Sequence, residues 1–196
     1  MRGKIMRTLA SIVGATMFAG TVHAAEPTLE TIPDPNYPFV QENADKAMKV
    51  AYIVAGKMCS TGDTSGGTVS KIPFSGGRQK YSAQLTIDHD DHTYDFILTD
   101  QLDVSSFFDY LTLKVYGKEV PIEKARTDFV NIIQIMDSGF DGHINMGIDR
   151  RTNKLYAITL SSKGMWEEKG KEHEPYFQDL YLKALDAVIA ACEAKQ

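Results

Sequence analysis

Apolar and polar residues alternate through residues 81–98, on both sides of the pair Asp90-Asp91. A period of two is typical of strands that bury one face. A two-residue turn at Asp90-Asp91 makes that face apolar throughout and sets His89 opposite His92. The facing apolar pairs are then Ile87–Tyr94, Leu85–Phe96 and Ala83–Leu98. A wider loop between the histidines is the alternative, because Asp-Asp suits a type I′ turn less well than Asn-Gly.

The two histidines at this hairpin tip predict a metal site. Imidazole nitrogens suit zinc and copper, and cross-strand neighbours lie about 5 Å apart at Cβ. Asp90 or Asp91 would supply a third ligand beside His89 and His92, whereas Asp88 is expected on the opposite face. The alternative is a solvated turn in which the aspartates bond to their own backbone.

A second, weaker metal pattern begins at Asp137. Asp137 and Asp141 match positions one and five of a calcium-binding EF-hand loop, which follows a helix. Position three is Gly139, which has no side-chain oxygen, and position twelve is Ile148 where a glutamate is needed. The alternative is a helix C-cap with Gly139 in a left-handed conformation.

Residues 1–24 have the pattern of a cleaved secretory signal peptide. Three basic residues precede the apolar stretch 8–22, which is too short and rich in small residues for a comfortable membrane span. An uncleaved anchor is the alternative. Cleavage after Ala24 predicts an exported protein, periplasmic or secreted, with no later transmembrane segment. It lowers the basic residues from 21 to 18 against 26 acidic ones, and the formal charge from −5 to −8. This acidity argues against nucleic acid and anionic membranes as partners.

Cys59 and Cys192 are the two cysteines of the chain. In an oxidising compartment an even cysteine count favours a disulfide, so we expect these two to pair. The alternative is a pair of buried thiols without a structural bond.

The remaining periodicity predicts an α+β fold. Residues 25–38 are expected as an extended lead-in and residues 39–196 as one domain. Apolar spacing of three and four predicts helices at 40–59, 121–136 and from Pro175 onward, with a further short helix from Val104. A second hairpin is expected from 143–148 and 155–160, with Asn153 left-handed. The predicted architecture is an antiparallel sheet of two β-hairpins, with three to four helices packed on one face.

Trp166, the only tryptophan, falls in a segment predicted as a charged loop. It is expected to close an edge of the core or, alternatively, to contact a ligand or partner. No G-x-S-x-G or H-E-x-x-H motif is present. We therefore expect a non-enzymatic binding or accessory module with a protein or small-molecule partner. The alternatives are a zinc- or copper-binding protein, with calcium less favoured, and a hydrolase whose site is assembled from distant residues.

Overall fold

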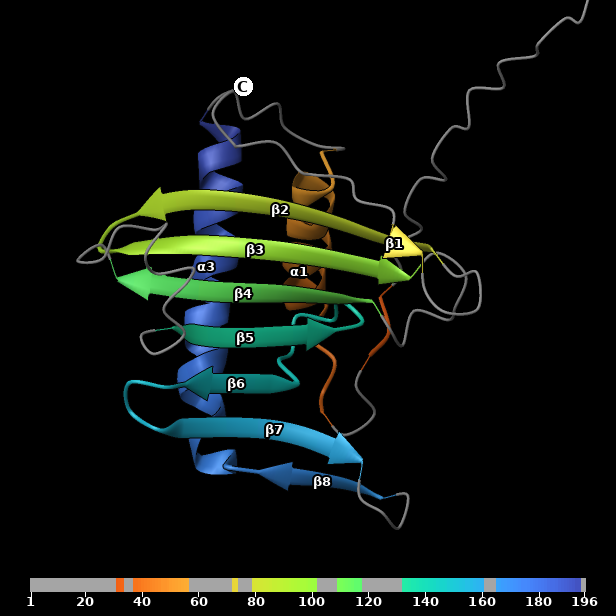
Figure 1. Ribbon diagram of the computed structural model, residues 1–196, viewed down its shortest axis with the longest axis vertical. Coiled ribbons are helices and arrows are strands. Elements are labelled where there is room, and N and C mark those ends of the chain that lie inside the picture. Colours follow the sequence, from red (N-terminus) through yellow and green to blue (C-terminus); the bar gives the residue numbers. More distant parts are fainter. Residues whose placement is uncertain are drawn as a thin grey trace, which may run out of the picture.

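The computed structural model describes residues 31–33, 37–56, 72–73, 79–101, 109–117, 132–160 and 165–194. Its strands form one antiparallel sheet in chain order, and two α-helices cover one face of that sheet (Figure 1). The strands are β1 (Ile72–Pro73), β2 (Gln79–His89), β3 (His92–Gln101), β4 (Tyr110–Gly117), β5 (Ile133–Ser138), β6 (Met146–Asp149), β7 (Lys154–Leu160) and β8 (Trp166–Lys169). The helices are α1 (Gln41–Val54) and α3 (Glu174–Glu193), with a 3₁₀ turn, η3 (Lys171–His173), before α3. The described residues include no helix long and apolar enough to cross a membrane.

The predicted architecture of two hairpins under three to four helices is wrong. The described residues form an eight-stranded meander with two α-helices. The end of the helix expected at 121–136 is strand β5, where Ile133, Ile135 and Asp137 are buried in alternation. The apolar pattern of this segment fits both a helical and a strand period. Pairing with β4 on one side and β6 on the other selects the strand, which β-branched isoleucine also favours. The rest of that segment, and the short helix expected from Val104, lie outside the described residues.

The first hairpin is confirmed in its register. Ile87 pairs with Tyr94, Leu85 with Phe96, and Ala83 with Leu98. The turn is Asp90-Asp91, and Asp90 takes the left-handed conformation at φ 49°.

The second hairpin is confirmed in part. β6 and β7 pair around a turn in which Asn153 is left-handed, at φ 56°. The strand begins at Met146 rather than His143, and β6 also pairs with β5. The segment around Trp166, expected as a loop, is instead the strand β8, which pairs with β7.

The core lies between the sheet and the two helices. α1 and α3 run in parallel, because Lys46 meets Asp186 at 3.0 Å and Lys49 meets Glu193 at 2.8 Å. The predicted apolar face of α3 is largely confirmed; its buried members are Phe177, Tyr181, Ala184, Leu185, Val188 and Cys192. α1 ends at Val54 rather than Cys59, and Gly56 follows in a left-handed conformation (φ 72°) that is typical after helix ends.

The disulfide between Cys59 and Cys192 stays a prediction, since Cys59 lies outside the described residues. Cys192 is buried in the last turn of α3, and the Lys49–Glu193 ion pair brings that turn beside α1, whose end is five residues before Cys59. We expect the unreduced, denatured protein to take up no iodoacetamide, and reduction to lower stability by about 4 kcal/mol. Mass spectrometry before and after reduction checks this. Two labelled thiols without reductant would contradict the bond.

Candidate functional site

The hairpin tip brings the predicted metal residues together only in part. His89 pairs directly with His92, and His89 Nε2 lies 3.3 Å from an Asp90 carboxylate oxygen. The His92 ring stacks parallel to Tyr94, with centroids 6.0 Å apart. Asp88 accepts a hydrogen bond from Thr93 instead. Over the described part of the chain, no three His, Cys, Asp or Glu side chains are grouped to hold an ion.

Metal binding at the tip is tested by melting the chelator-stripped protein with and without zinc or copper. A site made by both imidazoles raises the midpoint, and the shift disappears in a His89→Ala, His92→Ala double variant. Saturation at a hundredfold excess over the dissociation constant corresponds to about 2.7 kcal/mol of added stability. An equal shift in the double variant would place the metal elsewhere.

Asp137 and Asp141 are brought together, but both are buried, and Asp137 lies within strand β5 rather than after a helix. Asp137 is fully buried; one carboxyl oxygen accepts hydrogen bonds from the Tyr181 hydroxyl at 2.9 Å and the Gly142 amide at 3.0 Å. Burial and the negative charge of Asp141 raise the pKa of Asp137 to about 8. A carboxyl that keeps its proton at neutral pH is a poor calcium ligand. Gly139 is left-handed, at φ 88°, but the helix C-cap expected there is wrong, because Gly139 follows strand β5.

The loop after β5 contacts Ile32 of the N-terminal lead-in and both α-helices. The Ile32 amide donates to the Gly139 carbonyl at 2.7 Å. Gly142 lies so close to α1 that a Cβ there would sit 2.4 Å from the Asn43 backbone. Gln178 of α3 holds the loop from the other side: its amide nitrogen donates to the Gly142 carbonyl at 2.8 Å, and its oxygen accepts from the Ile144 amide at 3.1 Å. Ile32 of the lead-in is therefore joined to this loop by a backbone hydrogen bond.

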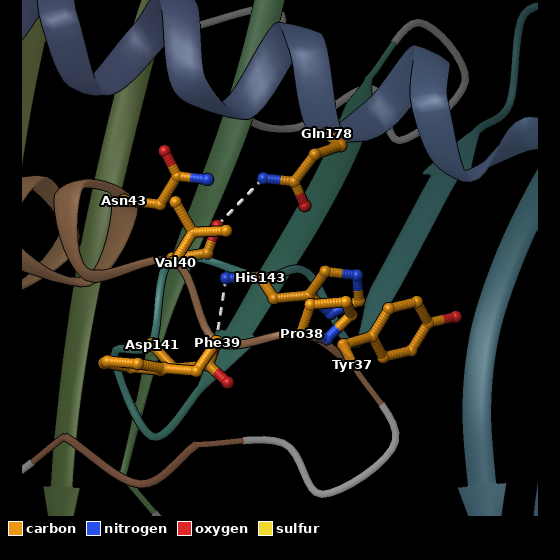
Figure 2. A pocket seen from close by; sticks show the side chains of 9 residues that line it. Tyr37, Pro38, Phe39, Val40, Asn43, Asp141, His143 and Gln178 are labelled. Carbon is orange, nitrogen blue, oxygen red and sulfur yellow. Dashed lines mark hydrogen bonds between the residues drawn. The ribbon is translucent and has the colours of Figure 1, made fainter.

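A small hollow lies between this loop and the lead-in (Figure 2). Its volume is about 90 Å³, and it is lined by Tyr37, Pro38, Phe39, Val40, Asn43, Asp141, Gly142, His143 and Gln178. The His143 ring stacks on Tyr37 with centroids 3.7 Å apart, and its Nε2 lies 3.7 Å from Glu174. The space suits a few waters or a very small group.

The Tyr37 hydroxyl joins the lead-in to the end of the sheet. It donates to a Glu168 carboxylate oxygen and lies 2.8 Å from the Tyr156 hydroxyl, which therefore donates to it. Lys171 meets the other oxygen of Glu168 at 2.9 Å. Burial, then the bond to Glu168, raise the pKa of Tyr37 to about 12, and burial raises that of Tyr156. The bond from Tyr37, with the Lys171 ammonium, holds the pKa of Glu168 below its usual value. Both tyrosines are thus locked as neutral hydrogen-bond donors.

Tyr37 also lines a second, more open hollow, which we call the Trp166 hollow. Its volume is about 130 Å³, and it is lined by Tyr37, Ile158, Trp166, Glu167, Glu168 and Lys171. Trp166 is 51 % exposed and its neighbour Met165 is 59 % exposed, so the expectation that Trp166 closes the core is wrong. An exposed indole on an outer strand is a feature of contact surfaces.

β8 also carries backbone groups that face away from the sheet. The Ile158 amide donates toward β6, to the Asn145 carbonyl at 2.9 Å. Backbone groups alternate in direction along a strand, so the N–H and C=O groups of Ala157 and Thr159 face β8. Their partners on β8, Lys169 and Glu167, point their own backbone groups toward β7. The N–H and C=O groups of Trp166 and Glu168 therefore point outward. In the described part of the chain no strand pairs with this side.

Two members of this region escaped the sequence analysis, Tyr37 and Tyr156, whereas Glu168 lies in the charged segment that was considered with Trp166. The only local signal was alternation through 155–160, which places Tyr156 on the apolar face. Tyr37 falls in the segment predicted as an extended lead-in, which carries no periodic signal. Tyr37 is more than a hundred residues away in sequence from both Tyr156 and Glu168, so no periodic pattern could predict these contacts.

No protein-family model, curated protein sequence or solved structure matches this chain.

Proposed function

We propose that the chain is an exported, non-enzymatic binding module that takes an extended segment of a partner protein as an added strand along β8. The observation that carries the proposal is the outer edge of β8, where Trp166 and Glu168 offer outward backbone groups beside an exposed indole. Strand addition obtains affinity from main-chain hydrogen bonds and specificity from pockets for alternate side chains. The Trp166 hollow is such a pocket. The predicted signal peptide supports export.

The chemistry of the neighbouring side chains favours binding over catalysis. Tyr37 and Tyr156 hold their protons more firmly than free tyrosine, so neither is an activated nucleophile or base at neutral pH. Asp137 is the carboxyl whose pKa is raised to near neutrality, as a general acid or base would need. It is fully buried and lines neither hollow. Glu168 is already engaged by Tyr37 and Lys171. The contacts of Tyr37 and Lys171 with Glu168 thus stabilise the edge strand β8.

Strand addition is tested with a capped peptide of sequence serine-threonine-valine-threonine-valine-threonine-serine, titrated against the intact protein. Trp166 is the only tryptophan, so its fluorescence reports on the edge directly. We expect a saturable change on wild type. Glu168→Pro removes one outward N–H while leaving the ladder with β7 intact, because proline is tolerated where the amide faces solvent. Each lost bond of this kind is worth about 1 kcal/mol, so binding should weaken about fivefold.

Glu168→Ala is the matched control. It also loses the contacts to Tyr37 and Lys171 but keeps the backbone N–H, so it should bind more tightly than Glu168→Pro. Circular dichroism and thermal melting establish that both variants are folded. Equal affinities of the alanine and proline variants would refute strand addition.

A further inference from the structure

His143 lies between a tyrosine of the lead-in and a carboxylate of α3. Its ring stacks on Tyr37 with centroids 3.7 Å apart (Figure 2), and its Nε2 lies 3.7 Å from a Glu174 oxygen. Only 17 % of the His143 side chain and 21 % of the Glu174 side chain are exposed, so water screens this pair less than an ion pair at the surface. A change of charge on His143 therefore changes how firmly Tyr37 is held.

The charges near this stack favour a protonated imidazole. Among the described residues they include Asp141 of the same loop, Glu168 of β8, Lys171 of η3 and Glu174 of α3. Three of these are carboxylates, and Lys171 lies 2.9 Å from Glu168, which it neutralises. The face of the Tyr37 ring attracts a cation as well. Together these attractions oppose the cost of burying the charge of an imidazolium.

We propose that His143 is a proton-operated lock for the lead-in, which holds Tyr37 more tightly when the imidazole is protonated. Histidine changes charge near neutral pH. Docking that favours the protonated ring is strongest at low pH and is lost as pH rises through the titration of His143. Burial, then the charge of Glu168, raise the pKa of Glu174, so in more acidic solution Glu174 also takes up a proton and the attraction ends. The lock is therefore tightest at mildly acidic pH.

The lock acts on both hollows, because Tyr37 lines each of them. Release of Tyr37 removes one wall of the small hollow and one wall of the Trp166 hollow. It also breaks the hydrogen bonds of the Tyr37 hydroxyl with Tyr156 and Glu168. The inference is independent of strand addition, since it concerns how Tyr37 is held and not what binds beside β8.

A double-mutant cycle at two pH values measures the lock directly. The cycle combines Tyr37→Leu with His143→Gln, and urea unfolding gives the coupling between the two positions. We expect the coupling, as a factor in the unfolding equilibrium constant, to be about fivefold larger at about pH 6 than at about pH 8. That factor is typical of a partly exposed ion pair with a cation–π contact. Asp137 is present in all four proteins, so its own pH dependence cancels.

Three further variants assign the effect to its parts. In a Glu174→Gln background the increase at low pH should fall below about twofold. Tyr37→Phe keeps the ring and loses only the hydroxyl, so its coupling to His143→Gln should not change with pH. His173→Gln is the matched control, because His173 Nε2 also lies 3.7 Å from a carboxylate, that of Glu172, but within η3. Its coupling to Tyr37→Leu should be the same at both pH values.

The outcomes decide the proposal in either direction. A coupling between His143 and Tyr37 that is equal at both pH values, or larger at about pH 8, would overturn it. An unchanged increase in the Glu174→Gln background would overturn it too, because Glu174 would then not be the counter-ion. If His143→Gln does not fold, His143→Phe, which keeps an aromatic ring against Tyr37 and takes up no proton, replaces it in the cycle with the same expected result.

Discussion

The Asp137→Asn variant is expected to gain stability relative to wild type as pH rises from about 4 to about 8, so that its advantage is much larger at pH 9 than at pH 5. Asp137 has a pKa of about 8 in the folded protein against 3.8 in a solvated chain. Between these values the folded state holds a proton that the unfolded state has released. The free energy of unfolding therefore falls as pH rises from about 4 to about 8, and levels off above. Asparagine is neutral throughout and removes this loss, on the order of a few kcal/mol.

Urea unfolding of both proteins across pH 5 to 9 measures the effect. Asp149→Asn is the control with the opposite sign. Burial by itself would raise the pKa of Asp149, but hydrogen bonds from Arg151, Thr152 and Tyr176 together lower it. Its ionised form stabilises the fold above the unfolded pKa, so Asp149→Asn should be destabilised at neutral pH. A wild-type stability that does not decline between pH 5 and 9 relative to Asp137→Asn would show that Asp137 is ionised in the fold.

Phe177→Ala is expected to lower the free energy of unfolding by about 3 to 5 kcal/mol, the largest loss we predict for a single side chain. Phe177 is fully buried in the first turns of α3 and fills the space above Gly147 of β6. A Cβ at Gly147 would lie 2.3 Å from the Phe177 ring, so the helix and sheet are in direct contact there. Truncation leaves a cavity that the rigid sheet cannot close. Denaturant unfolding should show a lower midpoint with an unchanged slope.

A double-mutant cycle tests whether the contact between Gly147 and Phe177 couples the stability effects of the two positions. Gly147→Ala alone should cost about 1 to 3 kcal/mol from overpacking. Combined with Phe177→Leu, which removes the ring, the loss should be smaller than the sum of the two single losses. Additive losses would mean that the two positions relax independently. Ala190→Gly on the exposed side of the same helix, which lacks this contact, serves as a control for helix propensity.

Elements with a strong short-range signal were predictable. Residues 81–98 carry matching apolar alternation on both sides of a turn, and one-residue slippage would expose their entire apolar face to water. α3 combines Pro175 in its first turn with seven buried positions on one stripe. In both cases, burial of a single face is sufficient to select the structure, so sequence and fold agree.

The stretch around Ile133 shows where this reasoning stops. Its isoleucines fit a helix or a strand, and the pairing with β4 and β6 selects the strand. β8 is a four-residue strand without a buried residue, so it has no buried apolar face that a sequence pattern could reveal. Its existence depends on the hydrogen bonds that β7 offers.

The sequence alone was enough for the first hairpin, the His89–His92 pairing and the last helix, because burying apolar side chains at fixed spacing admits few solutions. The same reasoning had no access to the contacts of Tyr37 with Tyr156 and Glu168, or to the outward edge beside Trp166. Those depend on which strands end up at the sheet boundary and on loop closures across more than a hundred residues. Such long-range pairings are chosen by the packing of the whole sheet, which no local period encodes.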